Sequence, residues 1–373
     1  MINITVVGIG RLGLGFALLL EKSGFNVLGV DVNQDYLNKL ENKTFKSAEP
    51  GYNEMIENSK HFHTTTSLKE GLEFSNLIFI LVQTPNGGNN RFYDHSILST
   101  LLSNINRLQP KDKHIVIGCT VMPDYCDEVA LTLLENCKNC SLSYNPEFIA
   151  QGDIVNGFEN PDMILVGTDA REEIKPIMKM IYSNMAKNTP KYCFLTLREA
   201  EITKIGINGY ITTKLSYANM ISDFCDKMGA SKDDVLDAIG SDSRIGTKYF
   251  KAGYSFGGPC FPRDTKALAQ CIEKEDLPSD LLRATTKYNE FHVEFQATQL
   301  LYMAKLQGRD KITVEGVCYK EGSQIPIIEE SAKLKIAHRL AKDICVEIKD
   351  TEELIQEVKK EYGNRFEYVV NPV

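Results

Sequence analysis

The chain has 373 residues, of which 43% are hydrophobic and 25% charged, and these proportions are ordinary for a folded protein of two or three domains. Its formal net charge of -8 and its pI of about 5.5 disfavour nucleic acid as a partner. No apolar run approaches the ~18 residues that a membrane-spanning helix needs, so we expect no membrane partner either.

The first half of the chain alternates short apolar runs with helical patterns. Residues 2–7 predict a buried strand, and Leu14–Lys22 predicts an apolar helix capped by Gly24. Strands that alternate with helices are typical of a doubly wound parallel sheet, so we expect an α/β protein that begins with a Rossmann-like domain. Further strands are predicted at residues 27–30, 77–83, 114–118, 141–143 and 163–167.

A glycine-rich turn joins the first strand to the first helix. Gly8, Gly10 and Gly13 have the spacing G-x-G-x-x-G, in which the first glycine makes a tight turn, the second lets a pyrophosphate approach and the third lets helix and strand pack. Asp31 follows the next strand, where a carboxylate binds ribose hydroxyls and repels a 2′-phosphate. The alternative is a glycine-rich turn in an unrelated α/β fold. We expect NAD as the cofactor, bound by Gly8, Ile9, Gly10, Arg11, Leu12, Gly13 and Asp31.

Ten cysteines are spread along the chain, and only Cys137 and Cys140 form a C-x-x-C pair. A metal site needs a second pair or histidines at ligand spacing, and neither follows, so we expect no metal. Free thiols in a chain of this size favour a reducing, cytoplasmic location, and the N-terminus shows no basic leader or cleavage site.

After about residue 197 the pattern becomes helical. Residues 198–229 predict one long helix, whose length indicates a connector that also forms a subunit interface, and helices continue to about residue 308. Gly206 and Gly209 lower the propensity of this helix and indicate a close approach by another group. From Lys311 a second α/β pattern is predicted, with strands at 311–319, 344–348 and 365–370 and helices at 331–341 and 351–361. We expect three domains: 1–197, 198–308 and a short α/β domain at 309–373.

One cysteine lies within an unusual segment, Phe256-Gly257-Gly258-Pro259-Cys260-Phe261-Pro262-Arg263-Asp264. The two glycines remove side chains beside the thiol, so a substrate can approach closely. Arg263 favours the thiolate, and Asp264 lies one turn beyond Cys260 if a helix begins there, within reach of a water near the sulfur. A nucleophilic cysteine in a chain with an NAD site indicates oxidation of an alcohol past the aldehyde to the acid.

Further residues can take part in this chemistry. Lys204 and Asn208 share a face of the long helix, where they could stabilise an alkoxide and hold a thiohemiacetal oxygen, although a helical lysine is usually a solvated surface residue. Glu147, in Asn145-Pro146-Glu147-Phe148, either caps a helix or orients the water that resolves a thioester. Thr120 ends a strand near the carboxyl edge of the sheet, where ligands of open α/β sheets collect.

With these residues the chain resembles the nucleotide-sugar 6-dehydrogenases, the family of UDP-glucose and GDP-mannose dehydrogenases, over almost its whole length. The resemblance implies that NAD takes two hydrides in turn from C6 of a nucleotide sugar and that Cys260 carries the thiohemiacetal and the thioester. It favours UDP-glucose, oxidised to UDP-glucuronate, in a homodimer built on the long helix. The motifs that carry it are Gly8-x-Gly10-x-x-Gly13, Glu49-Pro50-Gly51, Thr84-Pro85, Thr120-Val121-Met122-Pro123, Asn145-Pro146-Glu147-Phe148, Glu201-x-x-Lys204-x-x-x-Asn208 and Gly257-Gly258-Pro259-Cys260.

The resemblance also implies roles for individual residues. Thr120 resembles the threonine that holds the catalytic water, and Asp264 and Glu147 help that water to release the acid. Arg244 resembles an arginine that reaches the sugar nucleotide from a neighbouring subunit. The expected cofactor contacts therefore add Thr84, Thr120, Gln151 and Arg263, and the expected substrate contacts are Glu147, Phe148, Lys204, Asn208, Arg244, Phe256, Gly257, Tyr319 and Lys320.

The chain departs from the family pattern at several positions. Gln151 stands where a glutamate is usual, Arg263 replaces a lysine beside the cysteine, and residues 321–328 lack the arginine that the family has after Lys320. The C-terminal α/β segment is also short. These departures keep two alternatives open: GDP-mannose or another nucleotide hexose as substrate, or a homologue that binds nucleotide sugars without turnover. A two-electron dehydrogenase of the β-hydroxyacid type is a further alternative, because it also pairs an N-terminal fingerprint with a lysine on a helix, although it has no need for Cys260.

Overall fold

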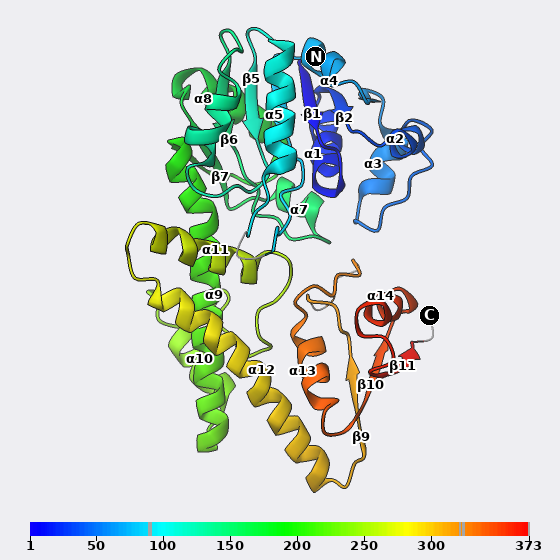
Figure 1. Cartoon of the computed structure of the whole chain (residues 1–373), viewed down its shortest axis with the longest axis vertical. Coiled ribbons are helices and arrows are strands. Elements are labelled where there is room, and N and C mark those ends of the chain that lie inside the picture. Colours follow the sequence, from blue (N-terminus) through cyan, green and yellow to red (C-terminus); the bar gives the residue numbers. More distant parts are fainter. Residues whose placement is uncertain (89–91, 321, 323–324, 372–373) are drawn as a thin grey trace. The chain divides into compact units, whose positions relative to one another are not determined.

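The computed structural model describes residues 1–88, 92–320, 322 and 325–371. The chain forms two compact units, residues 1–204 and 205–373 (Figure 1). Helix α9 (Leu197–Met228) runs through the boundary, and the second unit contains both the helical region and the C-terminal sheet. The α/β fold with a long central helix is confirmed, whereas the division into domains at 1–197, 198–308 and 309–373 stays a prediction.

An eight-stranded sheet forms the centre of the first unit, in the order β3-β2-β1-β4-β5-β6-β7-β8. Every neighbouring pair is parallel except β6 and β7, which run antiparallel. The strand order turns back between β1 and β4, and such sheets bind ligands at the carboxyl ends of the strands beside this point. The strands are β1 (Asn3–Val7), β2 (Asn26–Val30), β3 (Phe62–Thr65), β4 (Leu77–Ile80), β5 (His114–Ile117), β6 (Ser141–Tyr144), β7 (Met163–Thr168) and β8 (Lys191–Leu195).

The sequence pattern misses the two edge strands, β3 and β8. The residues of both strands are half-buried or exposed. Strand β3 lacks the continuous apolar run that marks the central strands, whereas β8 has such a run at residues 192–195, which the sequence interpretation did not assign to a strand. Strand β4 (Leu77–Ile80) begins where the strand at 77–83 was predicted but ends three residues earlier.

Helices cover both faces of this sheet. Alternate strand residues point to opposite faces, so Val6 and Phe79 join one apolar cluster with α1, while Val7 and Ile78 join a second cluster with α5. The helices are α1 (Arg11–Lys22), α2 (Gln34–Glu41), α3 (Tyr52–Asn58), α4 (Leu68–Phe74), α5 (Ser96–Leu108), the π-helical turn η1 (Tyr125–Ala130), α6 (Leu131–Leu133), α7 (Ile154–Glu159) and α8 (Arg171–Met185).

The second unit begins with helices and ends with a three-stranded parallel sheet in the order β11-β10-β9. Gly229, with a φ of +69°, lies just beyond the end of α9. Gly316, with a φ of +68°, lies just beyond the end of β9, so this strand stops short of the predicted residue 319. An apolar cluster around Val346 and Ile348 joins this sheet to the flanking helices. The remaining elements are α10 (Lys232–Gly240), α11 (Phe261–Lys274), α12 (Asp280–Leu306), β9 (Lys311–Glu315), α13 (Ala332–Leu340), β10 (Cys345–Asp350), α14 (Glu352–Tyr362) and β11 (Glu367–Val370).

Within the second unit, helix α9 buries many polar side chains and exposes large apolar ones. Ser216, Asn219, Ser222 and Asp223 are all buried. The exposed large side chains recur three, four or seven positions apart and therefore form one stripe along the helix: Tyr210, Tyr217, Met220, Phe224 and Met228. No helix in the described part of the chain has the length and hydropathy to span a membrane.

Candidate active site

The three glycines of the first turn meet different steric demands. Gly8 has a φ of +85°, and a Cβ there would lie 2.8 Å from the carbonyl oxygen of Leu81. A Cβ on Gly13 would lie 2.0 Å from the carbonyl oxygen of Gly8, so only glycine lets α1 pack this closely. A Cβ on Gly10 would meet no described atom within 4 Å. The turn thus leaves the N-terminus of α1 open, as a dinucleotide pyrophosphate requires.

Two tyrosines hold this turn through its main chain. The hydroxyl of Tyr36 donates to the carbonyl of Ile9 at 2.7 Å, and the hydroxyl of Tyr52 donates to the carbonyl of Arg11 at 2.8 Å. Sequence reasoning missed both, and the only signal was that Tyr52 directly follows the motif Glu49-Pro50-Gly51.

The predicted cofactor residues Arg11 and Gln151 meet although they lie 140 residues apart, because the Arg11 guanidinium donates to Oε1 of Gln151. The buried carboxylate of Glu49 accepts the main-chain N–H of Gly152, the residue after Gln151, at 3.0 Å. Asp31 directly follows β2, and its Oδ1 accepts one N–H at 3.1 Å. A carboxylate has about four acceptor positions, so Asp31 can still bind ribose hydroxyls. These residues and the open glycine turn fit NAD.

Thr84 and Thr120 lie beyond the carboxyl ends of the paired strands β4 and β5. The buried Thr84 hydroxyl donates to the main-chain carbonyl of Thr120 at 2.8 Å, so the two predicted positions are in contact. His95, which the prediction omits, accepts the N–H of Met122 at 3.3 Å, and burial lowers its pKa to about 4. The imidazole is therefore a neutral acceptor that fixes the segment after Thr120.

Glu147 is held between Tyr182 and Lys204. The Tyr182 hydroxyl has one hydrogen, which two acceptors share: Oε1 of Glu147 at 2.8 Å and Oδ1 of Asn145 at 2.6 Å. Nζ of Lys204 donates to the main-chain carbonyl of Glu147 and lies 4.4 Å from the centre of the Phe148 ring. Burial raises the pKa of Glu147 to about 7, although Tyr182 and Lys204 oppose the rise. This carboxyl therefore changes protonation near neutral pH, which suits a group that orients and deprotonates water.

Lys204 is only 7% exposed, so it is not the solvated surface lysine that a helical setting usually indicates. One turn earlier on α9, the fully buried Glu201 accepts the N–H groups of Asp124 at 2.8 Å and Cys126 at 2.7 Å. Burial raises the pKa of Glu201 to about 7. Glu201 thus ties α9 to the start of η1, just after the Thr120–Pro123 motif, and its task is structural.

In the second unit, Cys260 is exposed at the N-cap position of α11, so a helix does begin there. Its carbonyl accepts the N–H of Asp264 at 2.8 Å. The Asp264 carboxylate is 1% exposed, accepts Nδ2 of Asn208 at 2.7 Å and lies 3.7 Å from Nε of Arg263. Four predicted residues therefore come together at the start of α11, where the first N–H groups of the helix carry a partial positive charge.

The two glycines before Cys260 accommodate the chain's own main chain and side chains. A Cβ on Gly257 would lie 2.1 Å from the carbonyl oxygen of Glu330. Gly258 has a φ of +79°, and its Cβ would lie 2.4 Å from the ring of Tyr319. The sequence interpretation assigned the space beside these glycines to a substrate. The structure adds another reason for glycine at both positions, which is packing within the chain itself.

The close approach predicted at the α9 glycines occurs at one of them. A Cβ on Gly209 would lie 2.7 Å from Leu268 of α11, whereas a Cβ on Gly206 would meet no described atom within 4 Å. The space beside Gly206 is open, so the expectation of a close approach there stays a prediction.

The other predicted substrate residues of the second unit differ in their exposure. Phe256 is buried, and both its N–H and its carbonyl bind Asn289. The Arg244 side chain is 86% exposed and pairs with Asp242 at 2.6 Å. Lys320 is exposed. Of residues 321–328, where the family arginine is expected, residues 321, 323 and 324 lie outside the described residues.

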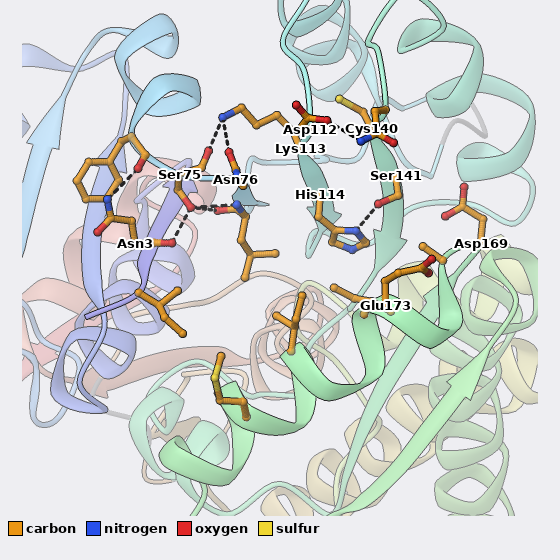
Figure 2. Close-up of a pocket in the computed structure, with 18 residues that line it drawn as sticks. Asn3, Ser75, Asn76, Asp112, Lys113, His114, Cys140, Ser141, Asp169 and Glu173 are labelled. Atoms are coloured by element: carbon orange, nitrogen blue, oxygen red, sulfur yellow. Dashed lines mark hydrogen bonds between the residues drawn. The ribbon is translucent and has the colours of Figure 1, made fainter.

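A cavity of about 950 Å³ lies at the opposite, amino edge of the large sheet (Figure 2). His114 there contacts the hydroxyls of Ser141 at 2.5 Å and Ser143 at 2.9 Å, and burial lowers its pKa to about 4. Lys113 donates to the carbonyl of Ser75 at 2.9 Å and to Oδ1 of Asn76 at 2.8 Å. None of the predicted site residues lines this cavity, and among the described residues no His, Cys, Asp and Glu cluster could hold a metal ion.

Two domain models of one family match the chain. The NAD binding domain of the UDP-glucose/GDP-mannose dehydrogenase family matches residues 2–186, and the central domain of the same family matches residues 198–291.

Individual proteins agree with this match. A protein named UDP-glucose 6-dehydrogenase from Rickettsia felis is 30% identical over 329 residues, which cover 86% of this chain and 72% of that protein. The structure of a UDP-glucose dehydrogenase from Pyrobaculum islandicum has a TM-score of 0.88 at 25% identity and covers 100% of this chain and 87% of that one. A GDP-mannose dehydrogenase structure from Pseudomonas aeruginosa, with a TM-score of 0.60 at 23% identity and coverage of 99% and 87%, shows likeness of fold alone.

Proposed function

Because the chain belongs to the UDP-glucose/GDP-mannose dehydrogenase family, we propose that it oxidises UDP-glucose to UDP-glucuronate through a thioester on Cys260. It is an NAD-dependent nucleotide-sugar dehydrogenase, and its glycine turn and Asp31 have the form that NAD binding requires. When bound, NAD supplies a hydride acceptor, and the two hydrides that leave C6 in succession go to two NAD molecules, one after the other.

The observation that carries this proposal is the exposed Cys260 at the start of α11, one turn before the buried Asp264, which binds Asn208. In the first oxidation the C6 hydroxyl loses its proton to solvent water, and Lys204 stabilises the alkoxide that results. The thiolate of Cys260 then adds to the aldehyde carbon, and the aldehyde oxygen becomes the thiohemiacetal oxygen. One N–H of Asn208 binds Asp264, so its second N–H is the donor for that oxygen.

Loss of the second hydride leaves a thioester between Cys260 and C6, and water then cleaves it. Water adds to the thioester carbon, the carbon–sulfur bond breaks, and the Cys260 thiolate leaves. Glu147 orients this water and takes its proton when ionised, for which its pKa of about 7 is suited. Thr120 contributes to holding the water, while Phe256, Gly257, Tyr319 and Lys320 contact the substrate.

The test is a panel of UDP- and GDP-hexoses with NAD, in which NADH and acid are counted per sugar consumed. Two NADH and one uronic acid with UDP-glucose support the proposal. One NADH and no acid would identify a two-electron dehydrogenase. A preference for GDP-mannose would identify GDP-mannose as the substrate in place of UDP-glucose. Binding without turnover would identify a binding homologue. Cys260→Ser should stop before acid release, whereas Cys271→Ser on the same helix should not.

We also propose that the chain forms a homodimer through the α9 stripe of Tyr210, Tyr217, Met220, Phe224 and Met228. These side chains are 39–68% exposed, while the opposite side of the helix buries polar groups, so a partner surface would remove a contiguous apolar area from water. Arg244, exposed on a nearby loop of the same unit, is then the residue that reaches the substrate of the second subunit.

Sedimentation velocity tests this assembly. Phe224→Glu should give monomers at micromolar concentration, and Leu281→Glu, an exposed leucine on α12, is the matched control that should leave the dimer intact. A monomeric wild-type chain, or a dimer unaffected by Phe224→Glu, would contradict the proposed interface.

A further inference from the structure

The segment 253–258, which leads to Cys260, is held through its main chain by polar side chains of two helices. Asn289 of α12 accepts the N–H of Phe256 at 2.8 Å and donates to its carbonyl at 3.0 Å. Asn219 of α9 accepts the N–H of Gly253 at 3.1 Å and donates to the carbonyl of Tyr254 at 3.2 Å. Two bonds from one amide fix both the position and the direction of the main chain, so the path of this segment is set by the helices.

A buried histidine adds a third attachment. The carbonyl of Gly253 accepts Nε2 of His292 at 2.9 Å and Nε2 of Gln296 at 3.0 Å. His292 is 2% exposed, and its Nδ1 lies 2.8 Å from Oδ2 of Asp223, to which the Tyr288 hydroxyl also donates at 2.8 Å. A carbonyl oxygen only accepts, so Nε2 carries a hydrogen, and the contact with Asp223 uses a further hydrogen on the ring or the carboxyl. The ring is thus fixed at both nitrogens.

This network is costly unless every member is bonded, because it buries a carboxylate, an imidazole and an amide. Asp223, His292 and Asn289 are 5%, 2% and 7% exposed. Their bonds end on the main chain of Gly253 and Phe256, within seven residues of Cys260. Such an arrangement fixes one main-chain position where apolar packing alone would allow several.

We propose that Asn289 and the Asp223–His292 pair are positioning residues: through Gly253 and Phe256 they set where the Cys260 sulfur meets C6 of the nucleotide sugar. The inference rests on the proposed function of Cys260. A displaced thiol adds more slowly to the aldehyde. NAD affinity is unaffected, because no proposed NAD contact belongs to this network: residues 8–13, Asp31, Thr84, Thr120 and Gln151 lie in the first unit, and the Arg263 side chain lies against Asp264.

Two substitutions separate the two bonds of His292. An asparagine amide nitrogen lies near the place of Nδ1, so His292→Asn keeps the bond to Asp223 and loses the bond to Gly253. A glutamine amide nitrogen lies near the place of Nε2, so His292→Gln keeps the bond to Gly253. Thr298→Ala is the matched control on α12, since the Thr298 hydroxyl binds the Glu294 carbonyl of its own helix at 2.8 Å.

The full-length variants are compared in thermal unfolding, in kcat and KM for UDP-glucose and NAD, and in the rate at which iodoacetamide alkylates Cys260, followed on its peptide by mass spectrometry. We expect His292→Asn to lower kcat/KM for the sugar about tenfold and to change the alkylation rate at least threefold, with an unchanged KM for NAD. His292→Gln should stay within threefold of the wild type, like Thr298→Ala.

Equal losses in the two histidine variants, or a folded His292→Asn with unchanged kinetics and alkylation, would overturn the proposal. If His292→Asn does not fold, Asn289→Asp carries the same test, because a carboxylate accepts the N–H of Phe256 but cannot donate to its carbonyl. Failure of the proposed function is distinguishable: the wild type would then produce no NADH with any nucleotide sugar, while the alkylation comparison still reports on Cys260.

Discussion

Replacing Tyr182 by phenylalanine should move the pH dependence of acid release to higher pH. The Tyr182 hydroxyl donates to Glu147 at 2.8 Å, and this bond lowers the pKa that burial raises to about 7. A hydrogen bond to a charged group contributes about 1.5 kcal/mol at the lower end of its range, which we use because Asn145 shares the hydroxyl. At 1.36 kcal/mol for each pKa unit, the loss corresponds to roughly one pH unit.

The size of the effect follows from the ionised fraction of Glu147. A midpoint that moves up by roughly one pH unit lowers this fraction about fivefold at pH 7 and very little at pH 9. The measurement is kcat for uronic acid formation between pH 5.5 and 9.5 at saturating NAD and sugar. Glu147→Gln should remove this titration, and Tyr192→Phe, whose hydroxyl contacts the Lys179 carbonyl at 3.5 Å, should leave the profile unchanged.

A Tyr182→Phe enzyme with the wild-type midpoint, or with a lower one, would refute the reasoning. Thermal unfolding of the same variants separates a titration effect from damage, because Tyr182→Phe also removes the hydrogen that Asn145 shares, and this loss should cost about 1 kcal/mol.

Three further outcomes are expected. Gly13→Ala should lower the unfolding temperature, because its Cβ meets the Gly8 carbonyl oxygen at 2.0 Å, whereas Gly10→Ala should fold normally and raise the KM for NAD. A normally folded Gly13→Ala together with an unstable Gly10→Ala would contradict the assigned roles. Asp31→Ala should weaken NAD binding and relax discrimination against NADP, and an unchanged NAD/NADP ratio of kcat/KM would remove Asp31 from the ribose site. Glu201 holds its proton more tightly folded than unfolded, so the stability it contributes is complete below about pH 4.5 and is lost as pH rises through about 7. In urea unfolding, the free energy by which the wild type is more stable than Glu201→Gln should therefore fall by about 2–3 kcal/mol between pH 5 and 8.5. A constant difference would show that Glu201 does not titrate there.

The amino-acid sequence by itself determined the features that depend on neighbours along the chain. The glycine turn, the central apolar strands and the long helix follow from local patterns, and the structure has all three. The position of Cys260 at the start of a helix follows from the proline and the helical pattern after it.

Only the tertiary structure decided which side chains meet across long separations. Tyr182 reaches Glu147 across 35 residues and His292 reaches Asp223 across 69, and no spacing in the sequence marks these pairs. The edge strand β3 likewise depends on its partner, because its sequence Phe-His-Thr-Thr carries no apolar run. Burial is a property of the assembled fold, so it decides that Lys204 and Glu201 are buried and that Glu147 titrates near pH 7.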